Sequence, residues 1–344
     1  MPILPFLLLA IAGSSPSGDE PARIATAVRA AEHLLAQQTP DGAITMGKIG
    51  EGQCWVVSYF GCFGAQGLLA AYTARRDRRF VDGALNWVQW YEAHQNADGT
   101  IFDYKGRPGD WQSTGHFDST DSYAAVYLDL LKDVFRATGD RTWLLKRSAS
   151  ISRAMKGIRL TMQPCGLTLA KPDYAVMYTM DNVESLLGLR AAASLCKALG
   201  DSRASQEAGR EADKMEAAIE SSLWNGAAGC YRIGIQPDGG KMEGLKDWYP
   251  DVMANLMAVA WLPPSPRHQA LYRMLIAKFG GWSKEIATVD DLEHAIWWGW
   301  AALGASDHAS LERLTGLTGA FERLCADGLE PGLLGHVARL CAAP

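Results

Sequence analysis

The chain has 344 residues, of which 48% are hydrophobic and 21% charged, and its formal net charge is −5. This is the composition of an ordinary globular protein with a sizeable core, and the acidic balance without any basic run argues against nucleic acid and anionic membrane as partners. Seven cysteines show neither metal-ligand spacing nor a dense disulfide pattern. Cys165 and Cys230 fall in predicted loops, where pairing stays open.

The first 18 residues resemble a secretory signal peptide. A short apolar run, Ile3–Ala12, is followed by Gly13, Ser14 and Ser15, although no basic residue precedes the run. The run is too short to span a bilayer. We therefore expect residues 1–18 to be removed and residues 19–344 to form one catalytic domain. The mature protein is expected to be secreted or periplasmic, without stable membrane insertion.

Twelve helices and little other regular structure are predicted after this leader. Apolar periodicity and capping residues set their boundaries. The expected ranges are 21–38, 59–75, 79–94, 120–138, 141–158, 181–199, 203–224, 250–262, 265–279, 290–303, 308–324 and 331–340.

Helices of two kinds alternate along the chain. Those at even positions in this order are apolar on every side, as in residues 295–303, which indicates burial all round. Those at odd positions are amphipathic, as in residues 207–218. The alternation predicts an all-α fold, an (α/α)6 double-ring helical barrel in which six helical hairpins close into an inner and an outer ring.

The connections that lead into the even helices are long, whereas several that leave them are short. Residues 94–119 and 158–180 contrast with residues 139–140 and 200–202. Long loops should therefore gather at one end of the barrel, where the inner helices begin, and binding residues usually lie on such loops. Residues 96–104 and 229–239 carry turn residues typical of short hairpins that would wall a cleft.

Acidic residues stand at most of these inner-helix starts. Asp121, Asp181, Asp251 and Asp290 each lie there, and Glu184 follows Asp181 by one helical turn. A single acidic residue at a helix start is usually a cap, because free N–H groups and the helix dipole favour a carboxylate. Several acidic residues that face the same cleft are more than helix capping alone requires. Their mutual repulsion should raise some of their pKa values, as a general acid requires.

Glycoside hydrolysis uses two carboxyl groups, one that protonates the leaving oxygen and one that activates water or attacks the sugar. The best catalytic pair is Asp181 with either Asp118 or Asp121, with Asp251 and Asp290 in reserve. Glu184 would orient Asp181 or bind a sugar hydroxyl. The predicted substrate-binding residues are Trp55, Trp111, His116, Glu184, Trp248, Tyr249, Asp251, Asp290 and His294.

Trp and Tyr residues are plentiful, at 12 and 11, and such rings serve as apolar platforms for sugars. Any single ring is more often part of the core, which is the better interpretation for Trp297. His116 and His294 fit hydrogen bonding to substrate and a structural role equally well.

No phosphate-binding loop, nucleophile elbow or zinc motif occurs in the sequence, so the expected hydrolase uses neither a metal nor a cofactor.

The helical alternation with acidic inner-helix starts resembles the six-hairpin glycosidases, which fold as an (α/α)6 barrel. Two segments, His116–Tyr123 and Tyr178–Glu184, are similar to the two Asp-bearing segments of unsaturated glucuronyl hydrolases. In that family the two Asp residues form a site that hydrates a double bond in the sugar. The resemblance implies that Asp181 is catalytic and that its partner is Asp118 or Asp121, because the local pattern departs from the family's at that point.

Four other classes compete with a hydrolase. Gln38–Gly42 and Gln95–Gly99 resemble the Gln…Asp-Gly turn repeats of isoprenoid cyclases, and Asp118–Asp121 resembles their acidic motif, but the repeat occurs only twice. Sugar epimerases share the barrel and rely on histidines. A non-catalytic glycan-binding barrel would lack the acid or the base. A polysaccharide lyase with Tyr178 or Tyr249 as base would need an Arg/Lys cluster in the loops, which the sequence does not show.

Overall fold

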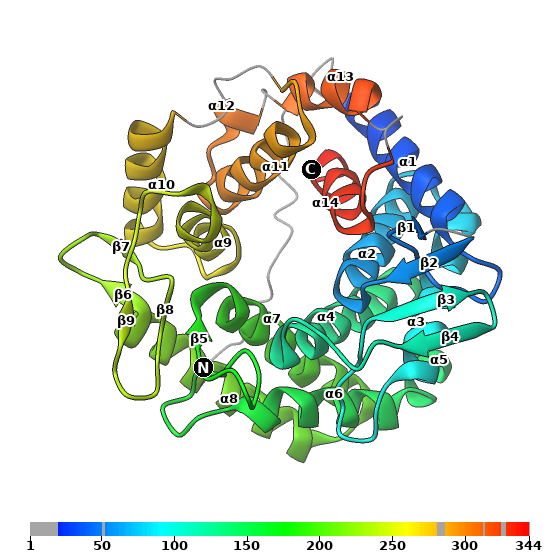
Figure 1. The fold of residues 1–344 in the computed structure, drawn as a ribbon, viewed down its shortest axis with the longest axis horizontal. Helices are drawn as coiled ribbons and strands as arrows, with labels where there is room; N and C mark the ends of the chain where they lie inside the picture. The colour runs from blue at the N-terminus through cyan, green and yellow to red at the C-terminus, as the bar shows by residue number, and fades with distance from the viewer. Residues whose placement is uncertain (1–19, 50–51, 281–285, 312–313, 325–327, 344) are drawn as a thin grey trace.

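The computed structural model describes residues 20–49, 52–280, 286–311, 314–324 and 328–343, so the predicted signal peptide lies outside the described residues. Helices dominate and are arranged in two concentric rings (Figure 1). Within the described residues the inner ring consists of α2 (Ser58–Arg75), α4 (Thr120–Thr138), α7 (Thr179–Leu199), α9 (Met253–Trp261), α11 (Val289–Gly304) and α14 (Pro331–Cys341). Each of these helices contacts the next, and α14 contacts α2, which closes the ring. The predicted all-α double-ring barrel is confirmed.

The outer ring is built from the amphipathic helices. Its members are α1 (Glu20–Gln37), α3 (Arg78–His94), α5 (Arg141–Leu145), α6 (Ser148–Thr161), α8 (Ser202–Ala218), α10 (Pro266–Phe279), α12 (His308–Leu311) and α13 (Leu314–Leu324). In α3, Phe80, Ala84, Trp87 and Tyr91 are buried at helical spacing, so one face packs inward and the other meets solvent. The alternation of buried and half-buried helices therefore follows the predicted order.

Three of the predicted helices are not regular α-helices over their whole predicted range. The range 141–158 divides into α5 and α6 because the backbone leaves the helical conformation at Arg147. The Arg147 guanidinium Nη1 donates to the Trp143 carbonyl oxygen at 3.0 Å and so satisfies an acceptor that the helix no longer uses. The range 203–224 ends as an α-helix at Ala218 and continues as a π-helical turn, η1 (Ile219–Leu223). A second π-helical turn, η2 (Trp248–Val252), leads into α9.

The starts of α4 and α7 are held side by side by a glycine contact. A Cβ atom on Gly188 would lie 2.5 Å from the Cα atom of Ala125, a separation that real side chains do not reach. Glycine at position 188 therefore allows the two inner helices to approach closely. Their first turns, which carry Asp121 and Asp181, belong to adjacent helices of the ring.

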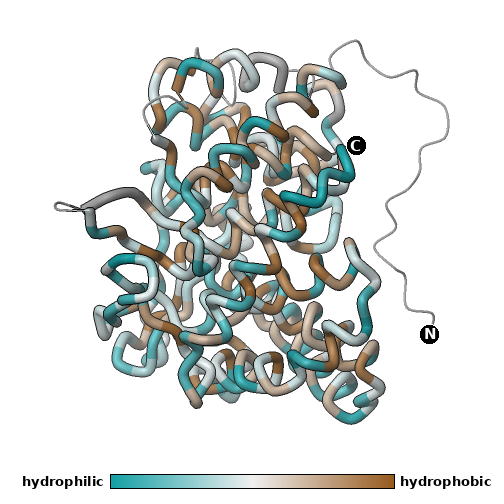
Figure 2. Tube along the Cα trace, turned by 90° about the vertical axis from the view of Figure 1, so that its right-hand side faces the viewer, coloured by the Kyte–Doolittle hydropathy of each residue, from teal (hydrophilic) through white to brown (hydrophobic). Residues whose placement is uncertain are grey.

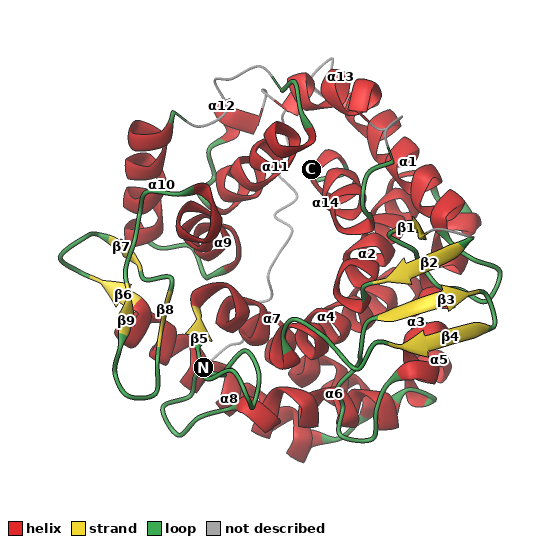
Figure 3. Cartoon of the chain, viewed as in Figure 1, coloured by secondary structure: helices red, strands yellow, loops and turns green. Residues whose placement is uncertain are grey.

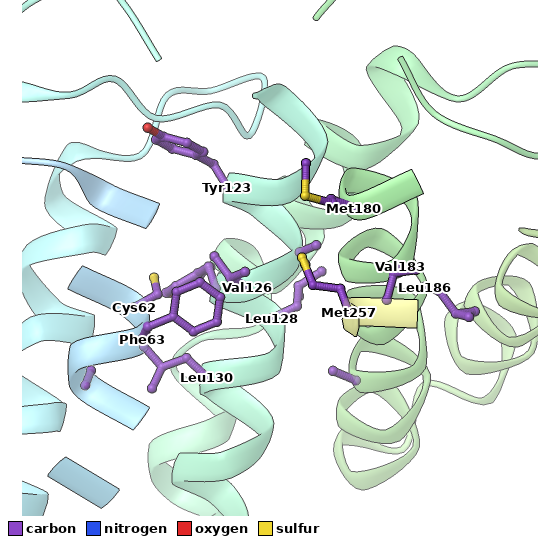
Figure 4. Packing of buried hydrophobic residues seen from close by; sticks show 14 of the residues in the cluster. Cys62, Phe63, Tyr123, Val126, Leu128, Leu130, Met180, Val183, Leu186 and Met257 are labelled. Atoms are coloured by element: carbon purple, nitrogen blue, oxygen red, sulfur yellow. The ribbon is translucent and has the colours of Figure 1, made fainter. Parts of the chain in front are cut away.

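Apolar side chains fill the interior of the inner ring. Phe63 of α2, Val126 of α4 and Met257 of α9 are all buried, and Figure 4 shows them facing the space between their helices. Tyr123 and Met180 lie nearer to the helix starts in the same view. Hydrophobic and hydrophilic segments alternate along the helices (Figure 2), and none of the described helices is long and apolar enough to span a bilayer.

Short strands lie in the loops that lead to the inner helices (Figure 3). The strands are β1 (Gly47–Ile49), β2 (Gln53–Val56), β3 (Tyr104–Arg107), β4 (Asp110–Ser113), β5 (Met177–Tyr178), β6 (Trp224–Asn225), β7 (Cys230–Tyr231), β8 (Gly234–Ile235) and β9 (Lys241–Met242). Strands β1 to β4 form one antiparallel sheet in sequence order, and β5, β8 and β9 form another.

Of the two predicted hairpins, one is wrong and the other is confirmed. A hairpin at residues 96–104 is wrong: residues 96–100 form a tight turn, in which the Asn96 N–H donates to the Thr100 carbonyl at 2.9 Å. The hairpin lies farther along, between β3 and β4, where residues 108–109 supply Pro and Gly for the turn. A hairpin near residues 229–239 is confirmed, since β8 pairs with β9 around residues 236–240.

Candidate active site

Ser119 bridges the acidic starts of α4 and α7. It is the N-cap of α4, and its Oγ accepts the Ser122 N–H at 3.3 Å. The same oxygen lies 2.5 Å from Asp121 Oδ1 and 3.3 Å from Asp181 Oδ2. Two carboxyl groups from neighbouring inner helices therefore share a single hydroxyl group.

That hydroxyl group carries one hydrogen, so it can donate to only one of the two carboxylates. The other contact becomes favourable when that carboxyl group is protonated and donates to the Ser119 oxygen. The Ser119 bridge is therefore fully satisfied when Asp121 and Asp181 together hold one proton.

Burial and charge both favour retention of that proton. The pKa of Asp181 is raised well above its ordinary value, first by burial and then by the charges of Asp121, Glu184 and Asp118. Burial also raises the pKa of Asp121, which has 0% of its surface exposed. Asp181 keeps some exposed surface and can meet a ligand, whereas Asp121 cannot. Asp118 is exposed on the loop before α4.

A tyrosine-bound carboxyl group lies one turn below Asp181. Glu184 is buried, and its Oε1 accepts the Tyr59 hydroxyl at 2.5 Å. Burial raises the pKa of Glu184 to about 7, although the Tyr59 contact acts in the opposite direction. The Tyr59 ring stacks on Tyr123, with ring centres 5.6 Å apart, which joins α2 and α4 at this level.

A fifth carboxyl group joins the cluster from the loop after α3. The Tyr123 hydroxyl donates to Asp103 Oδ1 at 3.1 Å, and burial raises the pKa of Asp103 to about 6. Asp103 and Tyr59 were not predicted from the sequence. Asp103 stands in a loop without a recognisable motif. Tyr59 stands at an inner-helix start and was missed because only acidic starts were considered.

Two tyrosines, Tyr178 and Tyr249, lie within range of the charge of Asp181. Tyr178 is the N-cap residue of α7, its ring stacks on Tyr174 with centres 6.3 Å apart, and the two hydroxyl oxygens are 3.0 Å apart. Tyr249 is 63% exposed. The pKa of Tyr249 is raised by partial burial and by the charges of Asp118, Asp181, Glu184 and Glu293, so this ring faces the acidic cluster.

Two further glutamates approach from α11 and α14. Glu330 caps α14, where its carboxylate accepts the Leu333 N–H at 2.7 Å and the Gly332 N–H at 3.3 Å. Burial raises the pKa of Glu330 to about 7, and the charge of Glu293 adds to that rise. The pKa of Glu293 is itself raised by burial and by Asp290. Neither Glu330 nor Glu293 is among the site residues predicted from the sequence.

Several predicted binding residues are engaged in other contacts. Asp251 is buried, and its Oδ2 accepts the backbone N–H groups of Lys246 at 2.8 Å and Asp247 at 3.4 Å. Its carboxylate therefore orders the loop before η2. The Trp248 and His294 rings are in contact, with their centres 3.7 Å apart and their planes tilted by 37°.

The remaining predicted residues divide between the core and the rim. Trp297 is buried, as expected for a core ring. Trp111 donates its Nε1–H to Asp41 Oδ2 at 2.8 Å and so ties the β1–β4 sheet to the loop after α1. Trp55 is 39% exposed on β2. His116 and Asp290 are exposed, His116 near Asp103 and Asp290 near Glu293.

Among the described residues no group of three or more His, Cys, Asp or Glu side chains has the geometry to hold a metal ion. Cys165 and Cys230 are both free, and the sulfur of Cys165 lies 3.9 Å from that of Met177.

No protein-family model matches this sequence, and neither does any curated protein. Solved structures do resemble the fold. A wild-type glycosidase superposes with a TM-score of 0.64 at 15% identity, covering 96% of this chain and 98% of that one. A variant glycosidase in complex with glucose gives the same TM-score, identity and coverage.

Two other solved structures have known source organisms. A GH78 family rhamnosidase of Bacillus sp. GL1 gives a TM-score of 0.63 at 13% identity, over 93% of this chain and 34% of that one. A β-1,3-1,4-glucanase from Paenibacillus sp. X4 gives 0.62 at 14% identity, over 94% and 91%. At these identities the likeness establishes the helical-barrel fold.

Proposed function

We propose that this protein is a glycoside hydrolase in which Asp181 is the general acid. The observation that carries the proposal is the Ser119 bridge, which joins a partly exposed Asp181 to a fully buried Asp121. A general acid must be protonated at working pH and must reach the leaving oxygen. Asp181 meets both needs, because its raised pKa favours the protonated form and the residue keeps some exposed surface.

In the proposed reaction, Asp181 donates its proton to the glycosidic oxygen as the bond to the anomeric carbon breaks. A second, ionised carboxyl group either activates water or attacks that carbon to form a covalent glycosyl-enzyme that water then hydrolyses. Both routes release two hydroxyl-bearing sugars. Asp118 is our first choice for this group, because it is exposed and close enough for its charge to raise the pKa of Asp181. Glu293 and Glu330 are the alternatives from α11 and α14. Asp121 is a positioning residue.

The neighbours support this class of reaction. They are glycosidases, a rhamnosidase and a glucanase, and one of the glycosidases is in complex with glucose. Rings such as Tyr249 and Tyr178 would stack on a sugar beside the carboxyl groups.

The acid role can be tested with leaving groups of different basicity. A good leaving group such as 2,4-dinitrophenolate departs without a proton, whereas an alcohol needs one. Asp181→Asn should therefore slow the release of an alcohol from a glycoside far more than the release of dinitrophenolate. Equal losses on both substrates would refute a general-acid role.

The second carboxyl group can be identified by azide rescue. If Asp118 has this role, Asp118→Ala should slow the cleavage of both substrates, and azide should restore it. If azide restores the activity of Glu293→Ala or Glu330→Ala instead, the role belongs to that residue.

A further inference from the structure

We infer that this site takes an uncharged sugar and rejects a uronic acid. The inference rests on the proposed glycan-binding function of the same site and adds the substrate class. It departs from the similarity to unsaturated glucuronyl hydrolases, whose substrates carry a carboxylate. The basis is the sign of the charges that surround the Ser119 bridge.

The charges that act most strongly on Asp181 and on Tyr249 all belong to acidic residues. Asp181 faces Asp118, Asp121 and Glu184, which come from the loop before α4, from α4 and from α7 itself. Tyr249 of η2 lies within range of the charges of Asp118, Asp181, Glu184 and also Glu293 of α11. The acidic character therefore extends across the site.

Cations of the inner helices are paired elsewhere. Lys132 pairs with Asp129 and Asp133, and Arg190 Nη2 lies 2.6 Å from Glu216 Oε2. Arg339 Nη1 donates to Gln66 Oε1 at 2.9 Å, in a group that also contains Asp129. None of these contacts involves the carboxyl groups at the Ser119 bridge.

The loops offer a similar picture among the described residues. Arg232 Nε is held by Glu243 Oε1 at 2.9 Å. Lys171 lies on the rim, with its Nζ 5.9 Å from the centre of the Tyr174 ring. Recognition of a carboxylate usually relies on a two-pronged Arg contact, and no described Arg side chain is placed for one at this bridge.

A uronic acid would thus bring a further negative charge into a partly buried acidic cluster, where charge repulsion is strong. An uncharged sugar suits the same groups, because carboxylates accept hydrogen bonds from hydroxyl groups. The exposed faces of Tyr249 and Tyr174, at 63% and 49%, offer apolar platforms for a sugar ring. Charge, hydrogen-bond capacity and ring exposure therefore favour the same substrate class.

The experiment compares matched sugar pairs that differ only at C6. p-Nitrophenyl glucoside and glucuronide, and galactoside and galacturonide, would be assayed as both anomers with the purified wild-type protein. Binding of gluco-oligosaccharides and oligogalacturonides to Asp181→Asn would be measured by calorimetry, so that recognition is scored even without turnover. We expect the uncharged member to be favoured by about 100-fold or more in kcat/KM or in affinity.

Charge-removal variants locate the cause. Glu293→Gln should reduce the discrimination against uronides, whereas Asp213→Asn, which removes an exposed charge from the outer helix α8, should leave it unchanged. Lys171→Gln tests the cation on the rim. If Lys171→Gln abolished the binding of a uronide that the wild type prefers, the inference would be overturned.

The remaining outcomes separate the two proposals. Preferred cleavage or binding of uronides would overturn the substrate class and leave hydrolysis intact. Preferential binding of uncharged glycans without cleavage would support the substrate class and contradict the proposed hydrolase. Failure to bind any uncharged glycan in the panel would overturn the inference together with the glycan-binding role on which it rests.

Discussion

Helix α4 carries buried carboxyl groups in two regions whose surroundings are opposite. Asp121, in its first turn, is near Asp181 and Glu184, and its pKa is raised by burial. Asp129, two turns further along, is also largely buried. Burial would raise the pKa of Asp129 too, but the charges of Lys132 and Arg339 and the contact with Gln66 lower it overall.

The difference shows what burial alone cannot tell. Both groups lose contact with water, yet only Asp129 is compensated by cations and by a hydrogen bond from Gln66 Nε2 at 2.8 Å. A compensated carboxylate stays ionised and holds helices together. An uncompensated cluster tends to bind protons and reduces stability, which natural proteins tolerate at functional sites. The two regions should therefore respond to mutation in opposite ways.

The largest expected effect is on activity. Asp181→Asn removes the proposed proton donor and should lower kcat on alkyl glycosides by about 1000-fold, within the range of general-acid catalysis. Circular dichroism should stay close to wild type, and thermal unfolding should show no loss of stability, because the amide replaces a buried carboxyl group whose pKa is raised. Asp213→Asn, on the outer ring, is the matched control. Retention of more than about a tenth of the activity by Asp181→Asn would move the acid role to another residue.

The second-largest expected effect is a rise in the free energy of unfolding when a carboxyl group of the acidic cluster is replaced. Glu184 has an ordinary pKa of 4.5 and a pKa of about 7 in the folded protein. The folded state therefore binds more protons than the unfolded state between these values, and stability should fall as the pH rises through that window. Glu184→Gln removes this loss and should raise the free energy of unfolding at pH 7 by about 3 kcal/mol.

Urea unfolding of wild type and Glu184→Gln at pH 4.5 and pH 7 measures this gain. The variant should retain the Tyr59 contact through its amide oxygen, so the two proteins should differ least at the lower pH. Equal stabilities at both pH values would show that Glu184 titrates normally.

Asp129→Asn should lower the free energy of unfolding, the opposite of the effect expected for Glu184→Gln. It leaves Lys132 and the buried Arg339 without their shared carboxylate, which should cost about 2 kcal/mol of unfolding free energy. Because the pKa of Asp129 is lowered, its contribution is present above the ordinary value of 3.8 and disappears as the pH falls. Asp121→Asn is the comparison and should change stability by less than about 1 kcal/mol. A larger loss at Asp121 than at Asp129 would contradict the contrast between the two regions.

The smallest effect is expected at the bridge itself. Ser119→Ala removes a hydroxyl contact that lowers the pKa of both Asp181 and Asp121. The pKa of Asp181 should rise, and the alkaline limb of the pH–rate profile should move up by about one pH unit, equivalent to about 1.4 kcal/mol. Ser119→Thr keeps the hydroxyl and should restore the wild-type profile. A uniform loss of rate at all pH values would indicate that Ser119 acts only as a helix cap.

The fold was predictable to a large extent, and the site only in part. The apolar inner helices and amphipathic outer helices follow from periodicity, which acts within one or two turns. Asp181 was recognisable because it opens an apolar helix. The choice between Asp118 and Asp121 was not, since the two stand three residues apart in one acidic segment. Exposure separates them: Asp118 meets solvent, and Asp121 is fully buried.

Local sequence was thus sufficient for the helices, their alternation and the acidic inner starts, because each depends on neighbours a few residues away. Tertiary structure alone brought Asp103 to Tyr123, Tyr59 to Glu184 and Glu293 near Tyr249, and it turned Asp251 into a loop contact. The physical reason is that the pKa of a carboxyl group, and its access to a substrate, depend on which other groups are buried beside it. That burial is complete only when α14 returns to α2 and closes the ring.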